Sequence, residues 1–244
     1  MITVTECDKP ILNYSSVSCD SGIHPKLDKY ELLSNFNRHS FNMIIGRPGS
    51  GKSSLLQSLF NNKHCFKKCF NSIYLFQPAT SRGSMKNDIF NNLPSEMVYN
   101  ELTENNLQQV INNIKQASDE KHCIILDDMG AYLKNNEIQR QLKELVFNRR
   151  HLHTSIFVVA QSYKSLPLDL RKLVTNFIVF KVSKLELNEI FKENVESLND
   201  YTDQISKIVY DAPHNFLAIN PETRQLFKNW DKLCITLPGE EDED

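Results

Sequence analysis

The eight residues from Gly46 to Ser53 constrain the fold of this chain more than any other segment. The chain has only seven glycines, and three of them, Gly46, Gly49 and Gly51, fall inside this segment. Glycine lets the backbone bend so that successive N–H groups converge on one point. The preceding residues 41–45 form a short apolar run, and residues 53–60 carry leucines at helical spacing. A strand, a glycine-rich loop and a helix in this order predict a phosphate-binding loop.

The side chains of the loop suit a nucleotide bound with its metal. Lys52 is placed to contact the β- and γ-phosphates, and the Ser53 hydroxyl is placed to ligate Mg²⁺. A glycine turn before an ordinary helix is the alternative, but it rarely matches every position of the pattern. We therefore predict binding of ATP and Mg²⁺. The residues predicted to bind the nucleotide are Gly46, Arg47, Pro48, Gly49, Ser50, Gly51, Lys52, Ser53 and Ser54.

Two adjacent carboxylates end a second apolar run, Cys123–Leu126. Paired acids at the carboxyl end of a buried strand are costly unless they hold a cation. We predict that Asp127 binds Mg²⁺, and that Asp128 orients or deprotonates the attacking water. A strand that simply runs into an acidic turn is the alternative interpretation, and the phosphate loop disfavours it.

A glutamine ends a third apolar run, Ser155–Ala160. The Gln161 amide is predicted to donate to the γ-phosphate and to accept from the attacking water. For this, the strand that precedes Gln161 must lie between the phosphate-loop strand and the carboxylate strand. A surface amide after a strand is the alternative.

Two adjacent arginines, Arg149 and Arg150, close the helix before that strand. Arginine at the end of a helix is favourable for the helix dipole alone, so a structural role stays open. The other hypothesis is an arginine finger that reaches the γ-phosphate of a neighbouring subunit. We expect both residues at the amino edge or flank of the sheet, away from their own phosphate loop. Arg171 is the next candidate.

Strand-like and helical stretches alternate along the chain, which predicts an α/β fold with a mostly parallel sheet covered by helices on both faces. One domain is expected over 39–238, after an N-terminal arm at 1–38 and before an acidic tail at 239–244. The predicted strands are 41–45, 72–76, 123–126, 155–160 and 177–180. The predicted helices are 53–60, 103–117, 138–147 and two within 184–209, with a hairpin over 215–228.

Composition narrows the class of protein. Of 244 residues, 40% are hydrophobic and 24% are charged, and no apolar run approaches the ~20 residues that would span a membrane. We expect a soluble protein without a secretory signal. The net charge of −2 argues against a general basic surface that coats nucleic acid. Lys63, Lys67 and Lys68 form a small basic patch, which is either a DNA-contacting loop or an ordinary solvated face.

Together these motifs resemble the genome-packaging ATPases of large nucleocytoplasmic DNA viruses, within the FtsK/HerA branch of P-loop NTPases. The resemblance covers about residues 40–185 and includes the phosphate loop and the Ile124–Asp128 strand. Three features make the resemblance specific. They are the helix that ends in two arginines, the strand that ends with Ala160 and Gln161, and the segment from Pro167 to Arg171. In that branch the sheet has the additional-strand arrangement.

The resemblance implies a homo-oligomeric ring that pumps double-stranded DNA into a capsid by hydrolysing ATP, in contact with a capsid or portal component. The expected location is the host cytoplasm at the assembly site, or the virion. Asp128 stands where many relatives of this branch carry Glu, so its reach is one methylene shorter. The other class of function is a nonmotor P-loop protein, either a nucleotide-dependent scaffold or a small-molecule kinase, although no Arg-rich kinase lid is evident.

Overall fold

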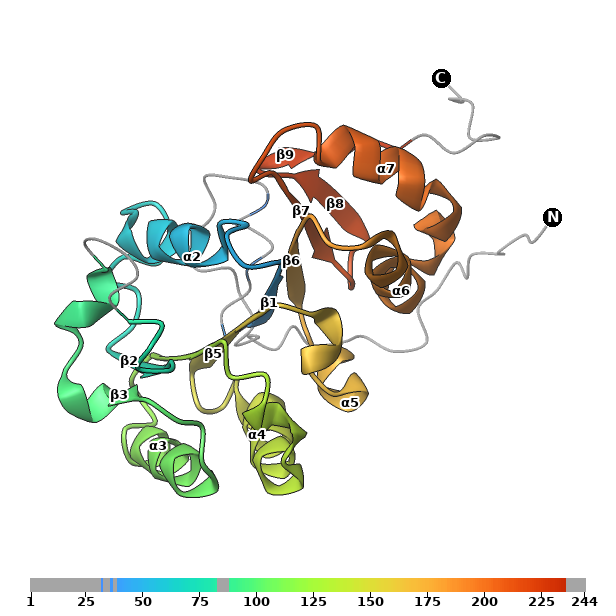
Figure 1. The fold of residues 1–244 in the computed structure, drawn as a ribbon. Helices are drawn as coiled ribbons and strands as arrows, with labels where there is room; N and C mark the ends of the chain where they lie inside the picture. The colour runs from blue at the N-terminus through green and yellow to red at the C-terminus, as the bar shows by residue number, and fades with distance from the viewer. Residues whose placement is uncertain (1–31, 33–35, 37–38, 83–87, 236–244) are drawn as a thin grey trace, which may run out of the picture.

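The computed structural model describes Leu32, Phe36 and residues 39–82 and 88–235. Within them, the strands form one nine-stranded sheet in the order β3-β2-β4-β5-β1-β6-β7-β8-β9 (Figure 1). The predicted acidic tail over 239–244 lies outside the described residues, as does the predicted arm over 1–38 apart from Leu32 and Phe36.

Six neighbouring strands of the sheet, in the spatial order β3-β2-β4-β5-β1-β6, pair in parallel. The alternation of strands and helices along the chain predicts this arrangement. All five predicted strands are confirmed within one residue at each end, and β5 lies between β1 and β4 as expected. The parallel strands are β1 (Phe41–Ile45), β2 (Ser72–Phe76), β3 (Val98–Tyr99), β4 (His122–Asp127), β5 (Thr154–Ala160) and β6 (Asn176–Phe180).

An antiparallel extension completes the sheet beside β6. It consists of β7 (Phe216–Asn220), β8 (Gln225–Lys228) and β9 (Asp231–Lys232). The predicted hairpin is confirmed as β7–β8. Its turn forms because the Asn220 side-chain oxygen accepts hydrogen bonds from the N–H groups of Glu222 and Thr223, at 3.0 and 3.1 Å.

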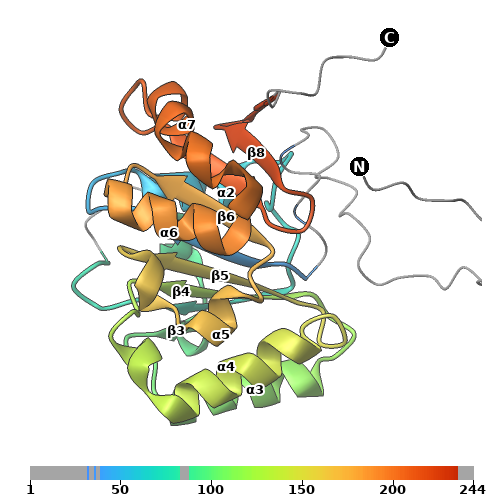
Figure 2. The same ribbon diagram turned by 90° about the vertical axis from the view of Figure 1, so that its right-hand side faces the viewer.

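Helices cover both faces of the sheet, as predicted (Figures 1 and 2). The face against α2 (Lys52–Asn61) buries alternate strand residues such as Ile44 and Val159. The opposite face is the larger, and its core includes Ile45 and Val158. The helices on that face are α3 (Glu104–Gln116), α4 (Asn136–Asn148), α5 (Leu168–Arg171), α6 (Lys184–Asn194) and α7 (Thr202–Val209).

Local sequence explains the best-defined helices. The Thr103 hydroxyl caps α3 by accepting from the Asn106 N–H, and four apolar residues at helical spacing are buried against the sheet. The Asn135 side chain caps α4 in the same way. The predicted helices at 103–117 and 138–147 are therefore confirmed, and α6 and α7 account for the two expected within 184–209. No helix in the described ranges is both long and apolar enough to cross a bilayer.

The register of β4, β5 and β1 aligns their carboxyl ends. Asp127 of β4 pairs with Val159, and Ile45 of β1 pairs with Ala160. The residues that directly follow these strands therefore emerge at one edge of the sheet. Gly46 is tied to this edge because its N–H donates to the Ala160 carbonyl at 3.2 Å.

Gly46 is predicted to tolerate no larger side chain. A Cβ atom at this position would lie 2.6 Å from Ser50 Oγ and 2.7 Å from Phe180 Cβ. Gly46→Ala should therefore lower the free energy of unfolding by roughly 1–3 kcal/mol, measured by denaturant titration. Gly130→Ala is the matched control, because its added Cβ would meet Ser165 at a milder 3.2 Å. An equal loss in both variants would contradict the packing argument.

Candidate nucleotide-binding site

The phosphate loop has the backbone geometry that its glycines predict. Gly49 and Gly51 have φ angles of 74° and 108°, in the region that favours glycine. Gly51 is the N-cap of α2 and supplies no side-chain cap, and the first turn of α2 has no acidic residue. The first N–H groups of α2 and the positive end of its dipole are thus available to an anion.

Lys52 lies over its own loop. Its ammonium group donates to the backbone carbonyls of Gly46 at 2.6 Å and Arg47 at 2.9 Å. Burial lowers the pKa of Lys52, while the nearby carboxylates of Asp127 and Asp128 act in the opposite direction. The lysine charge is therefore fixed at the loop, where phosphate oxygens would replace or join these carbonyl contacts.

Asp127, the last residue of β4, has a side chain suited to a cation. It is only 7% exposed, and its Oδ2 accepts a hydrogen bond from Gln77 Nε2 at 2.8 Å. Burial raises the pKa of Asp127, and the Gln77 hydrogen bond opposes this effect. The neutral amide orients the Asp127 carboxylate without pairing it with a positive charge, which suits a metal ligand.

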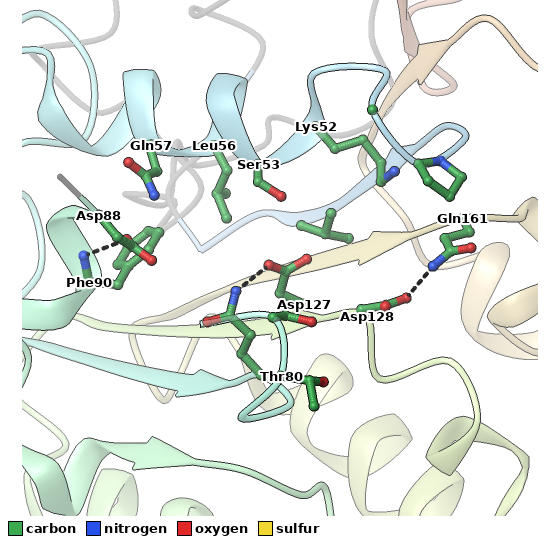
Figure 3. Close-up of a pocket in the computed structure, with 15 residues that line it drawn as sticks. Lys52, Ser53, Leu56, Gln57, Thr80, Asp88, Phe90, Asp127, Asp128 and Gln161 are labelled. Carbon is green, nitrogen blue, oxygen red and sulfur yellow. Dashed lines mark hydrogen bonds between the residues drawn. The ribbon is translucent and has the colours of Figure 1, made fainter. Parts of the chain in front are cut away.

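Asp128 turns the chain sharply out of β4. Its φ angle of 57° is left-handed, a conformation that Asp adopts more readily than most residues. Its N–H donates to Val159 O at 3.0 Å, and its Oδ1 accepts from Gln161 Nε2 at 3.0 Å (Figure 3). The structure therefore brings together the two residues predicted to handle water.

One pocket joins these groups (Figure 3). Lys52 and Gln161 lie at one end, Asp88 and Phe90 at the other, and Asp127 lies between them. The residues that line it are Pro48, Gly49, Lys52, Ser53, Leu56, Gln57, Gln77, Thr80, Ser81, Asp88, Phe90, Asp127, Asp128, Val159 and Gln161.

The charges that line this pocket fit a metal nucleotide. Three carboxylates, those of Asp88, Asp127 and Asp128, face a single lysine, Lys52. Oxygen ligands and an excess of negative charge suit a hard divalent cation such as Mg²⁺. Ser53 lines the same pocket and adds the hydroxyl that the sequence assigned to the metal.

Several residues of the pocket, chiefly Gln77 and Asp88, are not predicted by the sequence patterns. Gln77 directly follows β2, and the same pattern had identified Gln161 after β5, so a signal was present. Asp88 follows no strand. It caps a short 3₁₀ helix, Ile89–Asn92, by accepting from the Phe90 N–H. No residue pattern placed it near the site.

A second hollow lies on the other side of the phosphate loop and shares Gly49, Lys52 and Ser53 with the first pocket. Its remaining lining is aromatic, apolar and hydroxyl-bearing, without a carboxylate. These residues are Gly51, Ser54, Leu55, Ser58, Phe180, His214 and Phe216. His214 Nδ1 lies 3.0 Å from the Ser50 carbonyl oxygen and ties this wall to the loop. The chemistry of this hollow suits a nucleoside better than a phosphate.

Arg149 and Arg150 lie at the amino edge, as expected. Arg149 O accepts from Thr154 N at the start of β5, the opposite end of that strand from Gln161. The Arg149 guanidinium donates to its own chain, to His39 O at 2.9 Å and Val146 O at 2.7 Å. Burial and the neighbouring Arg150 charge lower the pKa of Arg149. Arg150 is exposed, so the finger hypothesis now favours it.

Arg171 is fully engaged within the fold. Its guanidinium pairs with Glu193 at 2.9 and 3.1 Å, donates to Leu166 O and stacks over the Tyr163 ring. A buried, multiply bonded arginine is a structural group. We therefore drop it as the next candidate for a finger.

Comparison with known proteins identifies the family. The family model of the poxvirus A32 protein matches residues 29–212. The chain belongs to the poxvirus A32 protein family. The DNA packaging protein OPG160 of Variola virus is 30% identical over 164 residues, which cover 64% of this chain and 58% of that protein. The A32-family chain thus spans less than two thirds of the length of this curated relative.

Solved structures share the fold of this A32-family chain. The DNA-packaging ATPase B204 from Sulfolobus Turreted Icosahedral Virus has a TM-score of 0.60 at 17% identity, over 79% of this chain and 98% of B204. The genome packaging NTPase B204 from Sulfolobus turreted icosahedral virus 2, in complex with ATP-gammaS, has a TM-score of 0.56 at 16% identity, over 80% and 98%. At these identities the likeness shows the P-loop NTPase fold.

Asp128→Asn separates nucleotide binding from turnover. An amide still hydrogen-bonds to water but cannot take its proton, so turnover should fall by ~10²-fold or more while ATP affinity is retained. Equilibrium binding of ATP and steady-state phosphate release measure the two effects. If affinity and turnover fall together, Asp128 acts as a metal ligand instead.

Proposed function

We propose that this chain is an ATPase that translocates double-stranded DNA into a viral capsid. The observation that carries the proposal is the convergence of Lys52, Asp127, Asp128 and Gln161 on one pocket beside the phosphate loop. A nucleotide, a metal and an attacking water need these groups together. The description of the Variola relative as a DNA packaging protein supports DNA as the substrate.

ATP would lie across the loop, with its terminal phosphate in the carboxylate-lined pocket and its nucleoside in the hollow beside His214. Ser53 and Asp127 would hold Mg²⁺, which would offset the negative charge of the phosphates. Lys52 would exchange its loop carbonyls for phosphate oxygens.

The Asp128–Gln161 hydrogen bond gives the water-activating step a defined starting point. In our proposal the nucleotide draws the Gln161 amide from Asp128 Oδ1 towards the γ-phosphate, and this makes a further oxygen of the carboxylate available to accept a proton from water. The Gln161 amide thus exchanges its contact with Asp128 for a contact with the γ-phosphate of the incoming nucleotide. Asp128 acts as the base, and Gln161 orients the water and the phosphate.

The proposed assembly is a homo-oligomeric ring that works with a capsid or portal component, in the host cytoplasm or the virion. The DNA-contacting surface includes Lys63, Lys67 and Lys68 in this proposal. All three are exposed in the turn that follows α2. Exposed lysines would contact phosphates without reading sequence, as a packaging motor requires.

DNA-stimulated ATP hydrolysis tests this function. Addition of linear double-stranded DNA should raise the steady-state rate of phosphate release several-fold. Lys52→Ala should abolish ATP binding and the stimulated rate while circular dichroism shows an intact fold, because it removes the charge that the phosphates require. ATP binding without DNA stimulation would favour the nonmotor scaffold, and phosphate transfer to a small molecule would favour the kinase.

Mixing variants tests the arginine pair. A double Arg149→Ala, Arg150→Ala variant should bind ATP but hardly hydrolyse it, and mixing it with Lys52→Ala should restore some activity. In mixed oligomers an intact loop from one copy can meet intact arginines from another. Of the single variants, Arg150→Ala should lose turnover, whereas Arg149→Ala should mainly lose stability. Mixed oligomers without recovered activity would rule out action in trans.

A further inference from the structure

Gln77 is held rigidly at the carboxyl end of β2. Its backbone N–H donates to Tyr99 O at 2.9 Å, and its backbone carbonyl accepts from Arg82 Nη2 at 3.4 Å. Arg82 is itself fixed by Asn100 Oδ1 at 2.6 Å. The Gln77 side chain is 7% exposed. Both the backbone and the burial of Gln77 therefore limit where its amide can point.

The two ends of the Gln77 amide have different surroundings. Nε2 donates to Asp127 Oδ2 at 2.8 Å, whereas Oε1 is buried and has no hydrogen-bond partner among the described residues. An ionised carboxylate only accepts hydrogen bonds, so the amide must present its NH₂ group to Asp127. This requirement fixes the orientation and leaves the carbonyl oxygen as a buried acceptor without a donor, on a residue that lines the pocket.

A buried acceptor that lines a ligand pocket usually receives a donor when the ligand binds. Mg²⁺ keeps several of its water molecules when it binds to proteins, and each of these waters is a hydrogen-bond donor. Gln77 already contacts the carboxylate that the proposed function assigns to the metal. The amide that carries the free acceptor is therefore in direct contact with the proposed metal ligand.

We propose that Gln77 is a positioning residue for the metal of the nucleotide. Its Nε2 fixes the Asp127 carboxylate, and its Oε1 accepts a hydrogen bond from a water of the bound cation. This inference rests on the proposed function, because it takes a divalent cation bound with ATP as the ligand. A neutral amide suits the role, since it orients Asp127 without cancelling the charge that attracts the cation.

Metal affinity measured with Mn²⁺ tests the proposal without relying on turnover. Gln77→Met keeps the length of the side chain but removes both the donor and the acceptor. With a nonhydrolysable ATP analogue present, the variant should bind Mn²⁺ about 10- to 100-fold more weakly by electron paramagnetic resonance. Its affinity for the analogue in EDTA should stay within about twofold of the unaltered chain, because the phosphate loop is untouched.

Gln141→Met is the matched control. Gln141 is also a buried glutamine, its Nε2 also lies within reach of a carboxylate, Glu137, and its Oε1 also has no partner among the described residues. It lies on α4 and does not line the pocket. This variant should lose stability like Gln77→Met but retain Mn²⁺ affinity. Gln77→Asn, which withdraws the amide by one methylene, should also weaken Mn²⁺ binding.

The outcomes separate this inference from the proposed function. If the unaltered chain binds no Mn²⁺ with the nucleotide analogue, the proposed function itself is overturned. If the unaltered chain binds it and folded Gln77→Met binds it equally well, only the role of Gln77 is overturned. An equal loss of Mn²⁺ affinity in Gln141→Met would show a general effect of stability and would also reject the role.

Discussion

The parallel register of three strands is the constraint on which the site depends. Because β4, β5 and β1 pair in parallel register, their ends lie within one residue of one another, and the next residue of each strand emerges at the same edge. Gly46, Asp128 and Gln161 are far apart in sequence but adjacent there. A slip of one residue in either pairing would turn a functional side chain towards the opposite face. The apolar alternation that fixes the register therefore also fixes the site.

The charges at this edge suit a cation and an anion bound together better than either one alone. Asp88, Asp127 and Asp128 line a pocket with one lysine, whose ammonium group already contacts two carbonyls. A triphosphate alone would add negative charge to an acidic wall, and a cation alone would leave the α2 N-terminus without an anion. A bound metal would contact the carboxylates, and a bound nucleotide would place its phosphates at the N-terminus of α2. The geometry therefore favours the two ligands together.

Much of the fold and the centre of the site could be predicted because they depend on local patterns. Apolar runs mark the strands, and the glycine loop, the paired acids and the terminal glutamine each follow a run directly. Asp88 could not be found in this way, because it caps a short 3₁₀ helix and no adjacent motif marks it. The sequence left a structural role open for Arg149, but it could not show the contact with His39, which lies 110 residues earlier in the chain. Such contacts depend on the tertiary arrangement.

The two ends of β5 have a consequence for symmetry. Gln161 follows one end and Arg150 precedes the other, and a seven-residue strand separates its ends by roughly 20 Å. A contact that joins the arginine edge of one copy to the nucleotide edge of the next uses two different surfaces, so it is heterologous. A twofold dimer would have to bring both edges into one self-complementary interface, which their separation disfavours. Copies joined in this way must either close head to tail around a rotation axis or continue as a helical filament.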